Sequence, residues 1–227
     1  MQKNAHSVQT EVEQALSVFL QEKINTVGCG RTDTGVHAKI FFLHFDVSNE
    51  IVNNVHFLHH VNCLLPHDIA VHQLIKVNPD AHARFDAVRR TYEYFLYQLK
   101  DPFLNGSAYF FPYPLDLEKM NRACAIMREY EDFSSFSKSR TQVKTNRCKI
   151  EEAAWRKEEG SIVFRISADR FLRNMVRAIV GTMTEIGENR IDENKFRDII
   201  EGRSRSEAGF SVPAHGLYLV DVKYRYL

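Results

Sequence analysis

The 227-residue chain has few of the features that mark special classes of protein. It has only four cysteines, at positions 29, 63, 124 and 148, and no two of them form a C-x-x-C pair. This spacing argues against a zinc site, and a chain of this length does not need a disulfide framework. No apolar run approaches the length of a membrane-spanning helix, and the polar N-terminus lacks the apolar stretch of a signal peptide. We therefore expect a protein of the reducing cytoplasm.

The chain also has almost no net charge. Its 30 Lys and Arg residues against 29 Asp and Glu give +1 at pH 7, and an average of this kind does not indicate nucleic acid. The distribution is more informative, because basic residues gather at Lys138–Lys149, at Arg84 with Arg89 and Arg90, and at Arg170 with Arg173 and Arg177. One such cluster is more often a solvated face, but three together favour a local positive surface for a polyanion.

Hydrophobic periodicity indicates an α+β fold with mostly antiparallel sheets and helices on one face. The hydrophobic fraction of 44% is ample for a core. Expected helices start at Ser7 and Ser48, cover 116–130, follow the apolar positions of 171–183, and start at Asp192. Expected strands cover 39–47, 69–77, 89–99, 149–156, 161–168 and 217–226. We expect two domains, 1–87 with the loop described next and 88–227.

Eleven residues between the first expected helix and strand form the most unusual stretch, GCGRTDTGVHA from Gly28 to Ala38. Asp33 lies between glycines, which permit a tight loop, and it follows Arg31 and Thr32. Burying an unpaired carboxylate is costly, so Asp33 needs a partner, and Arg31 is the nearest in sequence. Asp and Gly alone would indicate no more than a turn.

The string from Gly30 to Ala38 resembles the signature G-R-T-D-x-G-V-H-A of the tRNA pseudouridine synthase A family, which surrounds the catalytic aspartate. Other stretches resemble the family in the same order along nearly the whole chain. These are HARF at 82–85, RRTYEY at 89–94, SRT at 139–141, FLRNMVRAIVG at 171–181 and GLYL at 216–219.

This resemblance implies an isomerase that converts uridine to pseudouridine in the anticodon stem-loop of tRNA, at positions 38–40. It implies a homodimer that needs neither cofactor nor metal. We expect two ferredoxin-like-related halves with a central, positively charged cleft between them.

The resemblance also implies roles for three catalytic residues. Asp33 is the expected nucleophile, since a carboxylate is ionised at neutral pH and can form a covalent intermediate. Arg177 is the expected ion-pair partner that keeps it charged. Tyr92 is expected to stack on the extruded uracil, although a tyrosine in a strand is more often packed in the core. Proton removal by Tyr92 is the weaker alternative, because the ordinary pKa of tyrosine is about 10.

A further set of residues is expected to bind substrate. Among them, His37 is more often structural on composition alone and is expected to shape the loop, and Leu217 belongs either to the core or to the uracil pocket. The basic members are expected to contact phosphates, as are Lys138, Lys144 and Arg147. The complete set is Arg31, Thr32, His37, Arg84, Arg90, Arg140, Arg173 and Leu217.

This chain departs from the family pattern at one place. Family members begin with a strand bearing Y-D-G … G-W-Q, and the sequence lacks that pattern. Either the sequence is a piece of a longer reading frame, or the protein is shortened. A shortened protein favours a second hypothesis, a non-catalytic RNA-binding protein of the same fold. A third hypothesis, an aspartate-dependent phosphohydrolase, has little support, because no acidic cluster suited to Mg²⁺ lies near Asp33 in the sequence.

Overall fold

The computed structural model describes residues 7–138 and 145–227. Contacts divide the chain into two compact units, the first from Met1–Gly30 and Phe42–Asp86, the second from Arg31–Phe41 and Ala87–Leu227. The division into domains 1–87 and 88–227 stays a prediction. The contacts differ from it at one place, because Arg31–Phe41, which contains Asp33, groups with the second unit.

The first unit contains two helices and a short sheet. Helix α1 (Val8–Leu20) starts where the Ser7 hydroxyl accepts a hydrogen bond from the Thr10 N–H at 3.2 Å. Helix α2 (Asn54–Leu64) starts in the same way at Asn53. Strands β1 (Val27–Gly28) and β3 (Leu43–His44) pair antiparallel. The core of this unit is apolar and consists of Val12, Ala15, Leu16, Ile24, Phe57, Val61 and Leu65.

Three expectations for this part of the chain are wrong. The strand expected over 39–47 is reduced to β3, the helix expected at Ser48 starts at Asn54, and 69–77 contains no strand. The apolar residues that suggested strands, such as Phe45 and Val71, pack against the core of the first unit without a ladder of hydrogen bonds. The start of the expected strand joins the other unit, where the Lys39 N–H donates to the Leu219 carbonyl at 2.8 Å.

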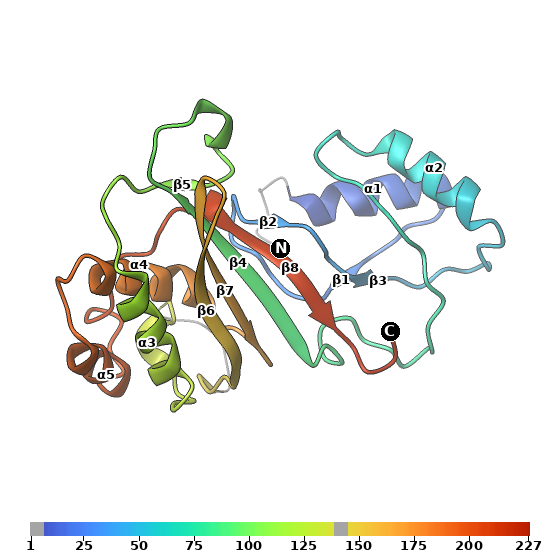
Figure 1. Ribbon diagram of the computed structural model, residues 1–227. Helices are drawn as coiled ribbons and strands as arrows, with labels where there is room; N and C mark the ends of the chain where they lie inside the picture. The colour runs from blue at the N-terminus through green and yellow to red at the C-terminus, as the bar shows by residue number, and fades with distance from the viewer. Residues whose placement is uncertain (1–6, 139–144) are drawn as a thin grey trace. The chain divides into compact units, whose positions relative to one another are not determined.

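The second unit has the β-α-β-β-α-β order of a ferredoxin-like fold (Figure 1). Its long strands lie in the order β8-β4-β7-β6 and pair antiparallel, and β2 and β5 add parallel pairings at β8 and β4. The α+β class with mostly antiparallel sheets is therefore confirmed. The elements are β2 (His37–Ala38), β4 (Arg89–Tyr97), β5 (Tyr109–Phe110), α3 (Leu117–Met127), β6 (Ile150–Glu158), β7 (Ser161–Ala168), α4 (Met175–Gly187), α5 (Glu193–Glu201) and β8 (Leu217–Lys223), with short 3-10 turns at Pro102–Leu104, Ser134–Phe136 and Ala214–Gly216.

The helices of this unit lie beside one face of the sheet, which is apolar (Figure 1). From β4 and β7, Tyr94, Phe164 and Ile166 are fully buried there, together with Met120 of α3 and Met175 of α4. No helix in the described parts of the chain is long and apolar enough to cross a membrane. The four cysteines are free thiols.

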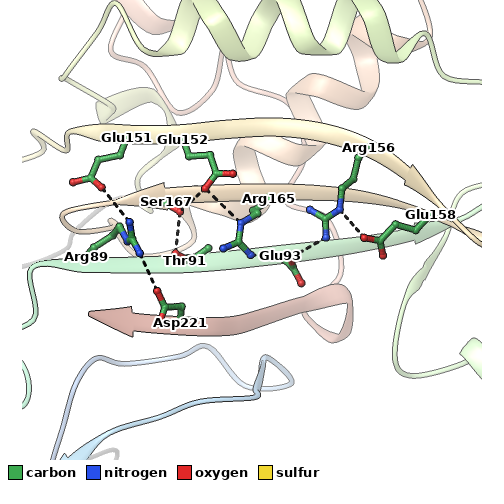
Figure 2. Close-up of polar contacts among 10 residues, drawn as sticks. All are labelled: Arg89, Thr91, Glu93, Glu151, Glu152, Arg156, Glu158, Arg165, Ser167 and Asp221. Carbon is green, nitrogen blue, oxygen red and sulfur yellow. Dashed lines mark hydrogen bonds and ion pairs between the residues drawn. The ribbon is translucent and has the colours of Figure 1, made fainter. Parts of the chain in front are cut away.

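The opposite face of the sheet is lined by charged side chains (Figure 2). Successive side chains of a strand point to opposite faces, so Glu93 lies opposite the buried Tyr94. One Glu93 carboxylate oxygen accepts hydrogen bonds from Arg156 of β6 at 2.9 Å and from Arg165 of β7 at 3.0 Å. Arg89 of β4 forms ion pairs with Glu151 and Asp221. These contacts join all four long strands across one face.

Glu93 is the most buried member of this charged network, with 10% of its side chain exposed. Burial raises the pKa of its carboxyl group, but the two arginines outweigh burial, so the pKa lies below its ordinary value of 4.5. A carboxyl group with a lowered pKa stabilises the fold above that ordinary value. The stabilisation is lost as the pH falls through the lowered pKa.

We expect Glu93→Gln to lower the free energy of unfolding at pH 7 by about 2 kcal/mol, because two charge-assisted hydrogen bonds weaken. Urea denaturation at pH 7 and at decreasing pH values measures this. The difference from the wild type should shrink as the pH falls from 4.5 through the lowered pKa of Glu93, because both proteins are uncharged at position 93 below that pKa. The matched control, Glu158→Gln, removes an exposed partner of Arg156 and should change stability by less than about 0.5 kcal/mol. Equal losses in the two variants would contradict this interpretation of the network.

Candidate active site

The Asp33 loop is attached to the edge of the sheet of the second unit. The Val36 N–H donates to the Asp33 carbonyl at 3.1 Å, which closes a turn over Thr34 and Gly35. Gly35 has a φ of +83°, a conformation that favours glycine at the third position of such a turn. Directly after the turn, His37 and Ala38 pair with Tyr218 and Leu219 of β8. The turn and the strand together fix where Asp33 lies.

Two guanidinium groups of the α4 region face the Asp33 carboxylate. Arg177 donates from Nη1 to Oδ2 at 3.2 Å, and the Nε of Arg173 lies 3.7 Å from Oδ1. Asp33 and Arg177 have only 26% and 20% of their side chains exposed, whereas Arg173 has 56%. The pair with Arg177 is therefore shielded from water, and Arg173 lies at the rim.

Arg177 is fixed from its other side by the segment that precedes β8. Its Nε donates to the Val212 carbonyl at 2.7 Å, and the Val212 N–H donates back to the Arg177 carbonyl at 3.3 Å. Next to it, the Tyr94 hydroxyl donates to the Pro213 carbonyl at 2.8 Å. Burial raises the pKa of Tyr94 well above its ordinary value, so this hydroxyl keeps its proton.

The same segment packs against α4 without space for a side chain between them. A Cβ atom added to Gly181 would lie 1.8 Å from the Phe210 carbonyl oxygen, and one added to Gly209 would lie 2.8 Å from the Thr182 nitrogen. The Gly209 N–H donates to the buried Thr182 hydroxyl at 2.9 Å. Both glycines are needed for this approach.

A pocket of about 600 Å³ opens at this place. Its lining carries one carboxylate and four cationic side chains, so it attracts anions. The lining residues are Asp33, Thr34, Lys138, Arg173, Asn174, Arg177, Arg205 and Ser211. In the described residues, no group of three or more His, Cys, Asp or Glu side chains is placed to hold a metal ion.

Comparisons with known proteins identify the family. A model of the family described as tRNA pseudouridine synthase matches residues 130–225. The chain is 50% identical over 224 residues to tRNA pseudouridine synthase A of Parabacteroides distasonis, and the match covers 99% of this chain and 89% of that protein. The chain belongs to the tRNA pseudouridine synthase A family. More distantly, the Bacillus subtilis protein of that name is 38% identical over 228 residues, which cover 99% of this chain and 92% of that protein.

Membership of the tRNA pseudouridine synthase A family confirms the resemblance and the enzyme class, an isomerase. The predicted catalytic roles stay predictions, but the structure brings two of the three residues together, Asp33 and Arg177. Tyr92 does not line the pocket. It is half-buried on the helix-covered face, pairs with Leu219 and Ile166, and makes an edge-to-face contact with Phe171 at 5.1 Å between ring centroids.

Of the predicted substrate-binding residues, Arg173 lines the pocket. Arg31 and Thr32 are exposed next to Asp33. His37 stacks on Tyr218 on the charged face of the sheet, with 4.6 Å between ring centroids. This contact is structural. Leu217 is buried in the core at the start of β8.

Among the other predicted basic residues, Arg84, Arg90 and Arg147 are not among those that line the pocket. Arg90 donates to the Ala87 and Asp169 carbonyls. Arg147 forms an ion pair with Glu131. Arg84 belongs to the first unit, where its guanidinium lies 5.9 Å from the Phe85 ring centroid. Arg140 and Lys144 lie outside the described residues. Lys138, expected to contact phosphate, does line the pocket.

Sequence reasoning missed three polar residues of the pocket, Asn174, Arg205 and Ser211. Asn174 precedes α4 in the left-handed conformation, with a φ of 67°. Arg205 and Ser211 lie in a segment that forms neither helix nor strand, so no periodicity distinguishes them. Only the fold brings this segment to Asp33.

We expect Gly181→Ala to destabilise the second unit by roughly 3 kcal/mol, because the new methyl group would overlap a backbone carbonyl that cannot move without displacing residues 209–212. Thermal unfolding measures the change. Gly187→Ala on the same helix is the matched control. There the methyl group would meet side-chain atoms, Leu115 Cδ2 and Met120 Sδ, both at 2.7 Å, which shift more easily than a backbone carbonyl, so the cost should be smaller than that of Gly181→Ala. Gly181→Ala with no more effect than Gly187→Ala would contradict the close packing.

Proposed function

We propose that this protein isomerises uridine to pseudouridine in tRNA with Asp33 as the nucleophile. The observation that carries the proposal is the half-buried Asp33 carboxylate, hydrogen-bonded to Arg177 inside a pocket lined by cations. A carboxylate in this state is available to attack, and the surrounding charge suits an RNA substrate.

The reaction needs no redox partner. The N1–C1′ glycosidic bond breaks, the uracil turns, and a new C5–C1′ bond forms. The C5 proton leaves and N1 takes up a proton, so the product is an isomer of the substrate. Asp33 provides a temporary covalent bond, at C6 of the base or at C1′ of the ribose. Arg177 favours the charged form of the carboxylate before attack, and it stabilises the carboxylate again when the intermediate breaks down.

The target uridine must leave its base stack before Asp33 reaches it. We assign Tyr92 to stacking on the extruded uracil, as the family resemblance implies. Tyr92 pairs in β4 with Leu219 of β8, which in turn pairs with Ala38, five residues after Asp33. This row of three residues connects the tyrosine strand to the Asp33 loop. The edge-to-face contact between Tyr92 and Phe171 holds the Tyr92 ring in place.

The family resemblance extends the proposal to positions 38–40 of the anticodon stem-loop, to a homodimer with tRNA across a positive cleft, to cytoplasmic location, and to activity without a cofactor. Mapping of pseudouridines in modified tRNA by carbodiimide labelling and primer extension tests the positions. Sedimentation velocity tests the dimer. Modified positions outside the anticodon stem-loop would contradict the first of these, and a monomer at assay concentrations would contradict the second.

We expect Asp33→Asn to lower tritium release from tRNA labelled at C5 of uridine by at least about 1,000-fold, because the amide cannot act as the nucleophile. The matched control is Asp198→Asn, an exposed aspartate on α5 that is not among the residues lining the Asp33 pocket, and it should keep wild-type activity. Equal release by Asp33→Asn and the wild type would overturn the assignment. Salt-sensitive tRNA binding with no release by the wild type would instead indicate a non-catalytic RNA-binding protein.

Lys138 and Arg173 are the pocket cations suited to phosphate. Lys138 has no ion-pair partner among the described residues, and its N–H donates to the Arg173 carbonyl at 3.1 Å, which places the two residues together. We expect Arg173→Gln and Lys138→Gln each to raise the KM for tRNA several-fold. Each should also reduce the slope of log affinity against log salt by about 1, since one phosphate contact is lost. An unchanged slope in both variants would exclude these contacts.

A further inference from the structure

Arg205 is the fourth cation of the pocket, and its environment differs from that of the others. It forms no ion pair among the described residues, and the residue as a whole is half-buried. The guanidinium donates instead to neutral acceptors of its own segment, from Nη1 to the Ala208 and Gly209 carbonyls at 3.2 and 3.0 Å and from Nη2 to the Ser211 hydroxyl at 2.8 Å. Three of the five N–H donors of Arg205 are thus occupied by acceptors of its own segment.

These three hydrogen bonds connect the first residue of the segment 205–212 to residues near its end, so the segment forms a closed loop. The segment forms neither helix nor strand, so its carbonyl groups need donors from elsewhere. A planar guanidinium presents several N–H groups in a fixed fork and can serve three acceptors together. A lysine ammonium has the same charge but not this geometry, so charge alone cannot replace Arg205.

The closed segment contacts the residue that precedes α4 and also contacts Arg177 itself. Ser211 Oγ, which accepts from Arg205, also accepts from Asn174 Nδ2 at 2.6 Å, and Asn174 precedes α4 three residues before Arg177. Next to Ser211, the Val212 carbonyl accepts from Arg177 Nε at 2.7 Å. Arg205 therefore acts on the start of α4 and on the guanidinium that reaches Asp33.

We propose that Arg205 is a positioning residue, which shapes the segment 205–212 so that Val212 directs Arg177 onto the Asp33 carboxylate. This inference rests on the proposed function, in which Asp33 is the nucleophile. It assigns Arg205 a role in turnover and no role in binding tRNA phosphates, although it lines the same pocket as Lys138 and Arg173.

The kinetic test separates the two roles. Arg205→Lys is expected to lower kcat for tritium release by roughly 10-fold or more, since a small misplacement of catalytic groups is costly. The KM for tRNA and the salt dependence of binding should stay within about 2-fold of the wild type, because no phosphate contact is lost. The matched control is Arg197→Lys. Arg197 lies on α5, its guanidinium is bound to Glu129, and neither residue is among those that line the pocket, so this variant should keep wild-type values. A raised KM with a retained kcat and a reduced salt slope would overturn the proposal, as would wild-type kinetics.

Chemical rescue distinguishes positioning from loss of folded protein. Added methylguanidine should restore part of the kcat of Arg205→Ala, because it can fill the vacated site and bridge the same acceptors. It should not restore Asp33→Asn. If Arg205→Ala does not fold, Ser211→Ala removes the acceptor shared by Arg205 and Asn174 and should lower kcat in the same direction. No rescue in a folded Arg205→Ala, or an unchanged Ser211→Ala, would count against the proposal.

Hydrogen exchange gives a readout that does not depend on activity. The Gly209 N–H is bound to Thr182 and the Val212 N–H to Arg177, so both should exchange faster in Arg205→Lys and as in the wild type in Arg197→Lys. Unchanged exchange would overturn the positioning role. An inactive wild-type protein with the expected exchange pattern would overturn only the proposed function.

Discussion

The guanidinium of Arg177 joins segments that are distant in the sequence. One edge reaches Asp33, 144 positions away, and another reaches Val212 in the segment that leads into β8. Because the Asp33 carboxylate is only 26% exposed, the hydrogen bond from Arg177 replaces contacts with water that burial removes. The turn at Gly35, the close packing of Gly181 with Phe210, and the cap of α4 all serve to hold these groups in one geometry.

The sheet of the second unit supports the site from both faces. The helix-covered face provides a rigid apolar core under α4, on which Arg177 is mounted. The charged face joins the long strands through Glu93 and its two arginines. The charged face also holds the residues that follow the Asp33 turn. His37 stacks on Tyr218, and the Lys39 ammonium lies 5.2 Å from the Phe95 ring centroid. Residues on either side of Ala38 are thereby held to β8 and β4.

Periodicity predicted the second unit well, because its long strands and helices each bury one clear face. The alternation of 161–168 corresponds directly to β7. The helical spacing of 171–183 corresponds to α4, which starts at Met175. The alternation of 39–47 gave a wrong prediction of one long strand. A pattern does not say which sheet a segment joins, and this segment divides between two units. The pairing of Asp33 with Arg177 was anticipated only through family resemblance. Arg205 was missed because its partners are two backbone carbonyls and one serine hydroxyl, and these form no distinctive sequence pattern.

The parallel pairing of β2 with β8 has a consequence for synthesis on the ribosome. Asp33 leaves the ribosome early, but Arg177 follows 144 residues later and β8 is translated close to the C-terminus. At a synthesis rate of about 5–20 residues per second, Arg177 is added roughly 7–30 s after Asp33. During that interval Asp33 is an ordinary solvated carboxylate on an unfinished chain. A nascent protein of this kind cannot form the Asp33–Arg177 pair until most of it has been made, nor the pairing of β2 with β8 until nearly all of it has been made.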